Sequence, residues 1–268
     1  MSRFEVQSAD GKLLAVWLEG DGPPIVMVHG SIADHTTLAP LVDELSKDMA
    51  TFSMDRRGFG ASAGADVQPY SIERDFADVA AVVDAVAGRT GGPVALFGHS
   101  YGANCAMGGA ARTRNVHHLV LYEPSLGLSY RPGSIEAVEA AVAAGDLEAA
   151  IVAVLVEILE MSDEDIAAVR SSQSSPSWST RTASAWTLPR ECRAEESWTY
   201  APVQFATIEA PTLLLAGSVS PADLAEATRR ACGAIPDARI EVLEGHAHMA
   251  HKADPALVGA IIRRFAMT

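Results

Sequence analysis

The sequence has few cysteines and few basic residues. Its 268 residues include only Cys105, Cys192 and Cys232, which are widely separated and in no metal-ligand spacing, so we expect neither a disulfide framework nor a zinc site. Lysine and arginine total 20 against 34 acidic residues, for a formal net charge of −14. Such a surface repels phosphate backbones and anionic lipid. We therefore expect a small-molecule substrate, no nucleic-acid or membrane partner, and no metal or cofactor.

Long apolar runs are also missing. The longest, residues 151–159, is interrupted by Glu157, and the first five residues lack the basic and then apolar pattern of a signal peptide. These absences predict a cytoplasmic protein. The apolar content of 49% is that of a soluble globular chain, and this length predicts one compact body with a large core. Self-association into a homodimer is left open.

The most informative stretch is Gly98-His99-Ser100-Tyr101-Gly102. It follows an apolar run and precedes a run of small residues, which is the strand, sharp turn and helix that present a nucleophilic serine. The turn requires minimal side chains at Gly98 and Gly102. Ser100 would then lie at a helix N-terminus, where free N–H groups favour a developing oxyanion. A Gly-Ser turn without chemistry is the alternative.

Short apolar segments alternate with helical patterns along most of the chain. This alternation predicts an α/β fold with a mostly parallel sheet covered by helices on both faces. The expected helices are 36–47, 71–87 and 255–265. The expected strands are 3–7 and 13–18, which form an antiparallel hairpin, and 25–28, 51–54, 93–97, 119–122, 212–217 and 239–243.

The alternation stops between residues 125 and 207. This part shows helical patterns at 134–144, 146–160 and 163–171, followed by a serine-rich stretch that contains Trp178, Trp186 and Trp198. We interpret it as a helical cap over the carboxyl edge of the sheet, inserted into a core of residues 1–124 and 208–268. A second independent domain is less favoured, because strands resume after residue 207.

Four motifs occur in one order along the chain. They are His29-Gly30, Asp55-Arg56-Arg57-Gly58-x-Gly60, Gly98-His99-Ser100-Tyr101-Gly102 and Glu244-Gly245-His246-Ala247-His248. Together they resemble the α/β-hydrolase superfamily over nearly the full length. The resemblance implies the α/β-hydrolase fold and a serine esterase or lactonase, although this scaffold hosts many chemistries.

The resemblance also implies roles for individual residues. Ser100 is the expected nucleophile and His248 the expected base, with His246 and His251 as rivals. An aspartate common in the family is replaced here by Ser220, so the third member is open between Glu123, which we favour, and Asp223. The expected oxyanion hole consists of the backbone N–H groups of Ser31 and Tyr101.

The remaining candidates concern the pocket and its surroundings. His29 is expected to pack beneath the oxyanion hole and is a candidate pocket residue together with Trp178 and Trp186, which would shape a site for a neutral, mainly hydrophobic group. Ordinary packing is the competing explanation for each tryptophan. Arg56 and Arg57 are expected to brace their loop.

A serine nucleophile excludes the chemistries of this fold that use an aspartate ester. We therefore expect hydrolysis of a carboxylic ester or lactone through an acyl-enzyme. Cleavage of a C–C bond, acyl transfer, cofactor-free perhydrolysis and slow-turnover ligand sensing are the alternatives.

Overall fold

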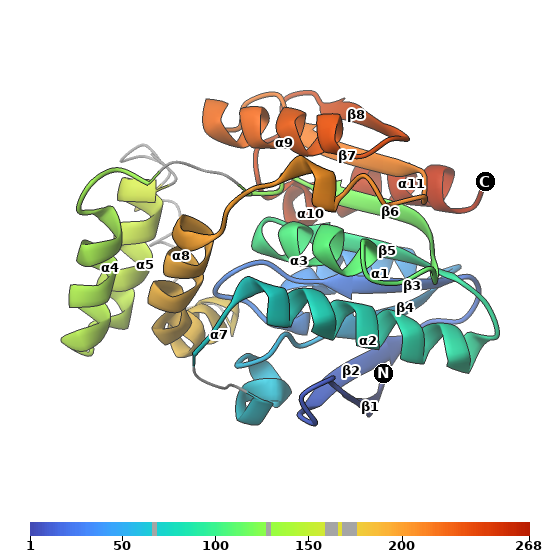
Figure 1. Ribbon diagram of the computed structural model, residues 1–268, viewed down its shortest axis with the longest axis horizontal. Coiled ribbons are helices and arrows are strands. Elements are labelled where there is room, and N and C mark those ends of the chain that lie inside the picture. Colours follow the sequence, from blue (N-terminus) through green and yellow to red (C-terminus); the bar gives the residue numbers. More distant parts are fainter. Residues whose placement is uncertain (66–68, 127–129, 159–165, 168–175) are drawn as a thin grey trace.

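An eight-stranded sheet runs through the centre of the molecule (Figure 1). The computed structural model describes residues 1–65, 69–126, 130–158, 166–167 and 176–268. The strand order is β1-β2-β4-β3-β5-β6-β7-β8, with β1 and β2 antiparallel to their neighbours and all other pairs parallel. The strands are β1 Ser2–Gln7, β2 Leu13–Glu19, β3 Pro24–Val28, β4 Ala50–Met54, β5 Val94–His99, β6 Val116–Tyr122, β7 Thr212–Gly217 and β8 Ala238–Leu243.

Helices cover both faces of this sheet. One face packs against α2 (Ile72–Thr90), α3 (Tyr101–Ala110) and α9 (Ala222–Ala234). The other packs against α1 (Ala39–Leu45), α10 (Ala250–Ala253) and α11 (Pro255–Ala266). The predicted α/β class with a mostly parallel sheet is therefore confirmed.

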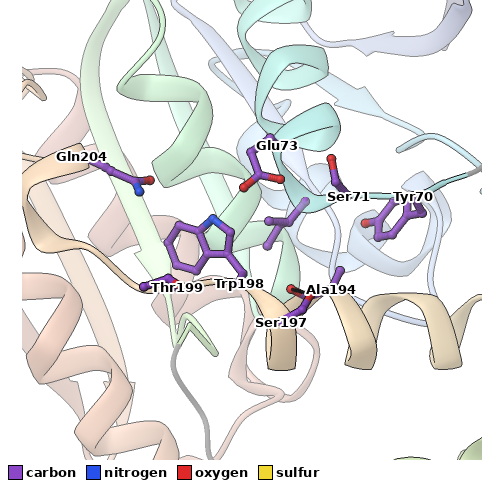
Figure 2. Close-up of a pocket in the computed structure, with 9 residues that line it drawn as sticks. Tyr70, Ser71, Glu73, Ala194, Ser197, Trp198, Thr199 and Gln204 are labelled. Carbon is purple, nitrogen blue, oxygen red and sulfur yellow. Dashed lines mark hydrogen bonds between the residues drawn. The ribbon is translucent and has the colours of Figure 1, made fainter.

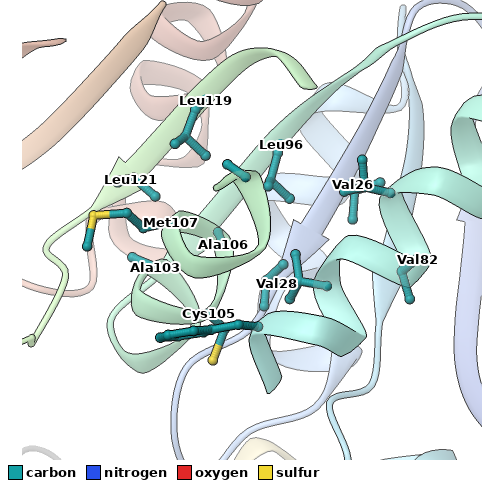
Figure 3. Packing of buried hydrophobic residues seen from close by; sticks show 14 of the residues in the cluster. Val26, Val28, Val82, Leu96, Ala103, Cys105, Ala106, Met107, Leu119 and Leu121 are labelled. Atoms are coloured by element: carbon teal, nitrogen blue, oxygen red, sulfur yellow. The ribbon is translucent and has the colours of Figure 1, made fainter. Parts of the chain in front are cut away.

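Side-chain alternation along the strands explains why both faces are apolar. In β3, Val26 and Val28 belong to the first core, whereas Ile25 and Met27 belong to the second. Figure 3 shows the first core, where these valines lie beneath α2 and α3. Strands buried on both faces read as continuous apolar runs, which is why they were recognisable in the sequence.

Residues 125–207 contain helices and, in their described part, no strand. The helices with described bounds are α4 Ser134–Ala143, α5 Leu147–Ala153, the π-helical turn η3 Val154–Ile158, α7 Pro176–Ser184, the 3₁₀ turn η4 Ala185–Thr187, α8 Leu188–Ser197 and the 3₁₀ turn η5 Pro202–Gln204. Figure 1 shows α4, α5, α7 and α8 grouped at one side of the sheet. We call residues 125–207 the helical insertion. Within the described residues, every helix is too short or too polar to traverse a bilayer.

The helical insertion was only partly predictable. The predicted helix at 134–144 matches α4, and α5 and η3 cover the predicted helix at 146–160 as far as residue 158, beyond which the prediction lies outside the described residues. Most of the predicted helix at 163–171 lies outside the described residues. The serine-rich stretch gave no helical prediction, yet α7 and α8 form there. In α8, Glu191 and Glu195 are held by partners distant in sequence.

Candidate active site

Ser100 lies at the turn between β5 and α3. Its backbone has φ 56° and ψ −129°, a region that non-glycine residues rarely occupy. Its N–H donates to the carbonyl oxygen of Tyr122 at 2.9 Å, which ties the turn to β6. A Cβ on Gly98 would lie 2.4 Å from the carbonyl oxygen of Gly102, and one on Gly102 would lie 2.2 Å from that of His29. Any larger side chain would therefore open this turn.

Glu123 follows β6 and contacts His248. Its backbone is also in the left-handed region, with φ 45°, and its side chain is fully buried. His248 Nδ1–H donates to Glu123 Oε2 at 2.6 Å, and the N–H of Gly217 donates to Oε1 at 2.7 Å. Burial raises the pKa of Glu123, but the hydrogen bond and charge of His248, with the Gly217 amide, bring it below its usual value. The carboxylate therefore stays charged and fixes the tautomer of the imidazole.

The alternative acid does not reach this imidazole. Asp223 is exposed in the first turn of α9. The rival histidines are also placed elsewhere: His246 Nε2 lies 3.8 Å from Asp254, and His251 is fully buried. Of the two carboxylates that the sequence left open, Glu123 is the one beside His248.

His99 joins the Ser100 turn to the His248 loop. Its Nε2–H donates to the carbonyl oxygen of His248 at 2.8 Å, and the two rings lie 4.5 Å apart between centroids. Tyr122 donates its hydroxyl to the carbonyl oxygen of Ala247 and accepts from the N–H of Ala250. Within the described structure, the Ser100 hydroxyl makes no hydrogen bond to His248. Ser100 and His248 are therefore connected through His99, the residue before Ser100, which contacts His248. The sequence analysis did not identify this contact.

The expected oxyanion donors lie on either side of this edge. Ser31 follows β3, and Tyr101 is the first residue of α3. For neither backbone N–H is a protein acceptor found in the described part of the chain. Ile32, the next residue, has φ 45°, which is a strained conformation for a β-branched side chain. Its side chain packs among the apolar residues of the helical insertion.

His29, two residues before Ser31, is fully buried. Its Nδ1–H donates to the carbonyl oxygen of Gly30 at 2.8 Å, and its Nε2 accepts from the N–H of Arg56 at 3.1 Å. Burial, with the nearby charge of Arg56, lowers the pKa of His29 to about 3. Both ring nitrogens are thus engaged with backbone groups of Gly30 and Arg56.

The two tryptophans proposed for the pocket differ in environment. Trp178 is buried in the apolar cluster of the helical insertion and donates its indole N–H to Glu148 at 3.1 Å. Trp186 is 39% exposed and lies against the guanidinium of Arg190.

A cavity of about 410 Å³ lies away from Ser100, between α2 and α8. Figure 2 shows Trp198, Glu73 and Gln204 around it. None of the predicted site residues lines it. Its wall includes Tyr70, whose hydroxyl lies 2.9 Å from that of Tyr101. Across the described residues, no group of three or more histidine, cysteine or acidic side chains is arranged to hold a metal ion.

Buried charges connect the helical insertion to the core. Arg56 is fully buried and donates to Glu191 of α8 at 2.6 Å, with Asp75 of α2 at 3.7 Å. It also donates to the carbonyl oxygens of His29 and Gly30 at 3.0 and 3.1 Å. Arg56 therefore braces the loop before Ser31 as well as α8.

Breaking this pair should destabilise the protein. We expect Glu191→Gln to lower the free energy of unfolding by about 3 kcal/mol, because it leaves a desolvated guanidinium with one counter-charge fewer. Chemical denaturation followed by circular dichroism measures this change. Glu196→Gln, on the exposed side of α8, is the matched control and should have little effect. Equal effects of the two substitutions would contradict the importance of the buried pair.

Comparison with known proteins agrees with this architecture. Residues 25–261 match the Alpha/beta hydrolase family. An alpha/beta hydrolase from Sphaerobacter thermophilus DSM 20745 is 30% identical, with a TM-score of 0.83 over 98% of this chain and 99% of that one. An enol-lactonase from Burkholderia xenovorans LB400 is 20% identical, with a TM-score of 0.78 over 99% and 100% of the two chains.

An esterase from Thermogutta terrifontis, solved with malate bound, is 21% identical, with a TM-score of 0.75 over 98% of this chain and 97% of that one. The last two structures share the fold at low sequence identity. No curated relative matches the chain. The family match over most of the sequence, together with the similarity to the Sphaerobacter hydrolase, leads to one conclusion: this chain belongs to the α/β hydrolase family.

Proposed function

We propose that this hydrolase cleaves carboxylic esters or lactones through an acyl-enzyme on Ser100. The observation that carries the proposal is the hydrogen bond from His248 Nδ1 to buried Glu123, at the sheet edge where His99 ties the His248 loop to the Ser100 turn. A neutral imidazole that donates from Nδ1 has Nε2 available to accept a proton. For proton transfer, the hydroxyl of Ser100 must come within hydrogen-bonding distance of His248 Nε2. Hydrogen bonds between catalytic residues often shorten only when substrate binds.

Each step then has a group to perform it. Ser100 Oγ attacks the carbonyl carbon while His248 Nε2 takes its proton, and Glu123 stabilises the resulting imidazolium. The N–H groups of Ser31 and Tyr101 receive the oxyanion. The imidazolium returns the proton to the leaving alcohol, which departs and leaves the acyl group on Oγ. Water, deprotonated by His248, attacks this ester, and Ser100 is released together with the carboxylic acid.

The alcohol or acyl part of the substrate would occupy the space between the sheet edge and the helical insertion. Supporting this placement, Ile32 beside the proposed oxyanion hole packs into the apolar cluster that includes Ile151 and Leu155. An apolar wall favours a mainly hydrophobic chain next to the reacting carbonyl. We further propose that residues 125–207 form the cap of this enzyme.

A labelling experiment tests the proposed nucleophile. A fluorophosphonate probe should label the protein once, and mass spectrometry should locate the adduct on Ser100, because the probe reacts with activated serine hydroxyls. In parallel, 4-nitrophenyl esters of increasing chain length should be hydrolysed at rates well above the background. An unlabelled protein that turns over no ester would overturn the proposal.

A further inference from the structure

Among the described residues, no carboxylate forms an ion pair with either of two cations, Arg181 and Lys252. Arg181 belongs to α7, and Lys252 belongs to α10, four residues after His248. Both side chains are partly withdrawn from solvent. In the described part of the chain, no carboxylate oxygen lies within 4.0 Å of either charge. Burial lowers the pKa of Arg181.

This lack of pairing contrasts with Arg56 and Arg57, which are fully buried. Arg56 has Glu191 and Asp75 as partners, and Arg57 has Asp78 and Asp10. The chain carries 34 acidic residues, so acidic partners are abundant. Desolvating a charge without a partner costs free energy. Such a cost is tolerated where a ligand supplies the missing charge.

Arg181 follows Trp178 by three residues, a spacing that places both on one face of α7. Ala185 begins the 3₁₀ turn η4 directly after this helix. Both Trp178 and Ala185 pack in the cluster that contains Ile32. Ile32 directly follows Ser31, whose N–H is a proposed oxyanion donor.

Lys252 and His251 complete the cluster from the core side. Burial and the charge of Arg181 lower the pKa of Lys252 to about 8, opposed by Asp34. One oxygen of that carboxylate, Asp34 Oδ1, accepts from the N–H and the hydroxyl of Thr36. Burial and the charges of Lys252, His248 and Arg181 hold the pKa of His251 well below its usual value.

His251 is a further buried polar group next to Lys252 without a hydrogen-bond partner among the described residues. The ring is fully buried, and no hydrogen-bond partner is found for either nitrogen among the described groups. Its centroid lies 4.2 Å from that of His99, which in turn packs against His248 at 4.5 Å. Buried polar atoms are usually satisfied. The unpaired cluster is therefore continuous with the proposed catalytic residues.

We propose that Arg181 and Lys252 bind a carboxylate carried by the substrate, so that the enzyme acts on esters or lactones with an apolar chain ending in a carboxylate. This inference rests on the proposed function and refines the expectation of a neutral substrate. A guanidinium matches a carboxylate with two parallel hydrogen bonds, and the lysine adds a second charge. The negative surface of the protein does not oppose this recognition, because the local groups are cationic.

A matched pair of substrates tests the inference. In 4-nitrophenyl hexanoate the acyl chain ends in a methyl group, and in mono-4-nitrophenyl adipate a carboxylate replaces that methyl. We expect wild-type kcat/KM to be at least about tenfold higher for the adipate ester, as one charge-assisted hydrogen bond provides. A preference for hexanoate, or equal rates, would overturn the inference while the proposed ester hydrolysis stands.

Two variants test whether Arg181 and Lys252 cause the preference for the adipate ester. Arg181→Met should raise KM for the adipate ester by about tenfold relative to KM for the hexanoate ester, and Lys252→Met should act in the same direction. Arg229→Met removes the same charge from the exposed surface of α9, where Arg229 pairs with Glu226, and should not alter the preference. If both substrates lose activity equally in Arg181→Met and Lys252→Met, the two cations have only a structural role.

A binding measurement separates this inference from the proposed chemistry. Free adipate should raise the melting temperature of the wild type and of Ser100→Ala, but not that of Arg181→Met, because binding does not require turnover. This result would hold even if no ester were hydrolysed. Stabilisation by inorganic phosphate and not by adipate would overturn the assignment of a carboxylate.

Discussion

Ser100→Ala should abolish ester hydrolysis and leave the protein folded. Removal of the nucleophile in a serine hydrolase lowers kcat by about 10⁶-fold, and an effect of that order is expected here for 4-nitrophenyl esters. Alanine keeps the small Cβ that the backbone at φ 56° already accommodates, so the turn between β5 and α3 should persist. Steady-state kinetics with purified protein, together with circular dichroism, measures both properties.

The control for this substitution is another serine to alanine change outside the site. Ser197→Ala removes an exposed hydroxyl at the end of α8 and should leave kcat unchanged. Residual activity in Ser100→Ala close to that of the wild type, with an unchanged circular dichroism spectrum, would mean that another group is the nucleophile.

Glu123→Gln should lower kcat by about 10⁴-fold, as replacement of the triad carboxylate by its amide does in a serine protease. The amide retains the shape of the side chain and an acceptor for the Gly217 N–H. Its NH₂ group, however, can donate to His248 Nδ1 and would favour the tautomer with the proton on Nε2. That imidazole cannot accept the proton of Ser100. The measurement is kcat for a 4-nitrophenyl ester at neutral pH.

Asp223→Asn is the matched control for the acid. It makes the same chemical change on an exposed carboxylate of α9, and we expect activity close to that of the wild type. The opposite pattern, with Glu123→Gln active and Asp223→Asn inactive, would show that the acid has been assigned to the wrong residue.

The parts of this structure that depend on local pattern were predictable. Buried strands such as β5 are apolar throughout, and the glycines around Ser100 mark a turn that no larger residue fits. The position of Glu123 directly after an apolar run made it a candidate acid. Its contact with His248 depends on a left-handed backbone at Glu123 and on the pairing of β6 with β7, which no local pattern encodes.

Long-range polar contacts were the part that could not be predicted. The sequence around α8 reads as a polar stretch, yet Glu191 reaches Arg56, and Glu195 accepts hydrogen bonds from Asn104 and Ser125. These partners come from residues 70 to 135 positions away, so only the folded chain identifies which charges are buried. The same reason explains why Arg181 and Lys252 drew no attention in the sequence.

The guanidinium of Arg56 contacts both α8, which belongs to the helical insertion, and the backbone that precedes the proposed oxyanion donor Ser31. One side chain holds the carbonyl oxygens of His29 and Gly30 and also the carboxylate of Glu191. Any displacement of α8 that made room for a larger substrate would therefore move the carboxylate of Glu191 away from Arg56. Arg56 is the side chain that holds the peptide preceding Ser31. Enlarging the entrance by moving this helix would loosen the catalytic backbone at the same time, so the two properties cannot be altered independently at α8.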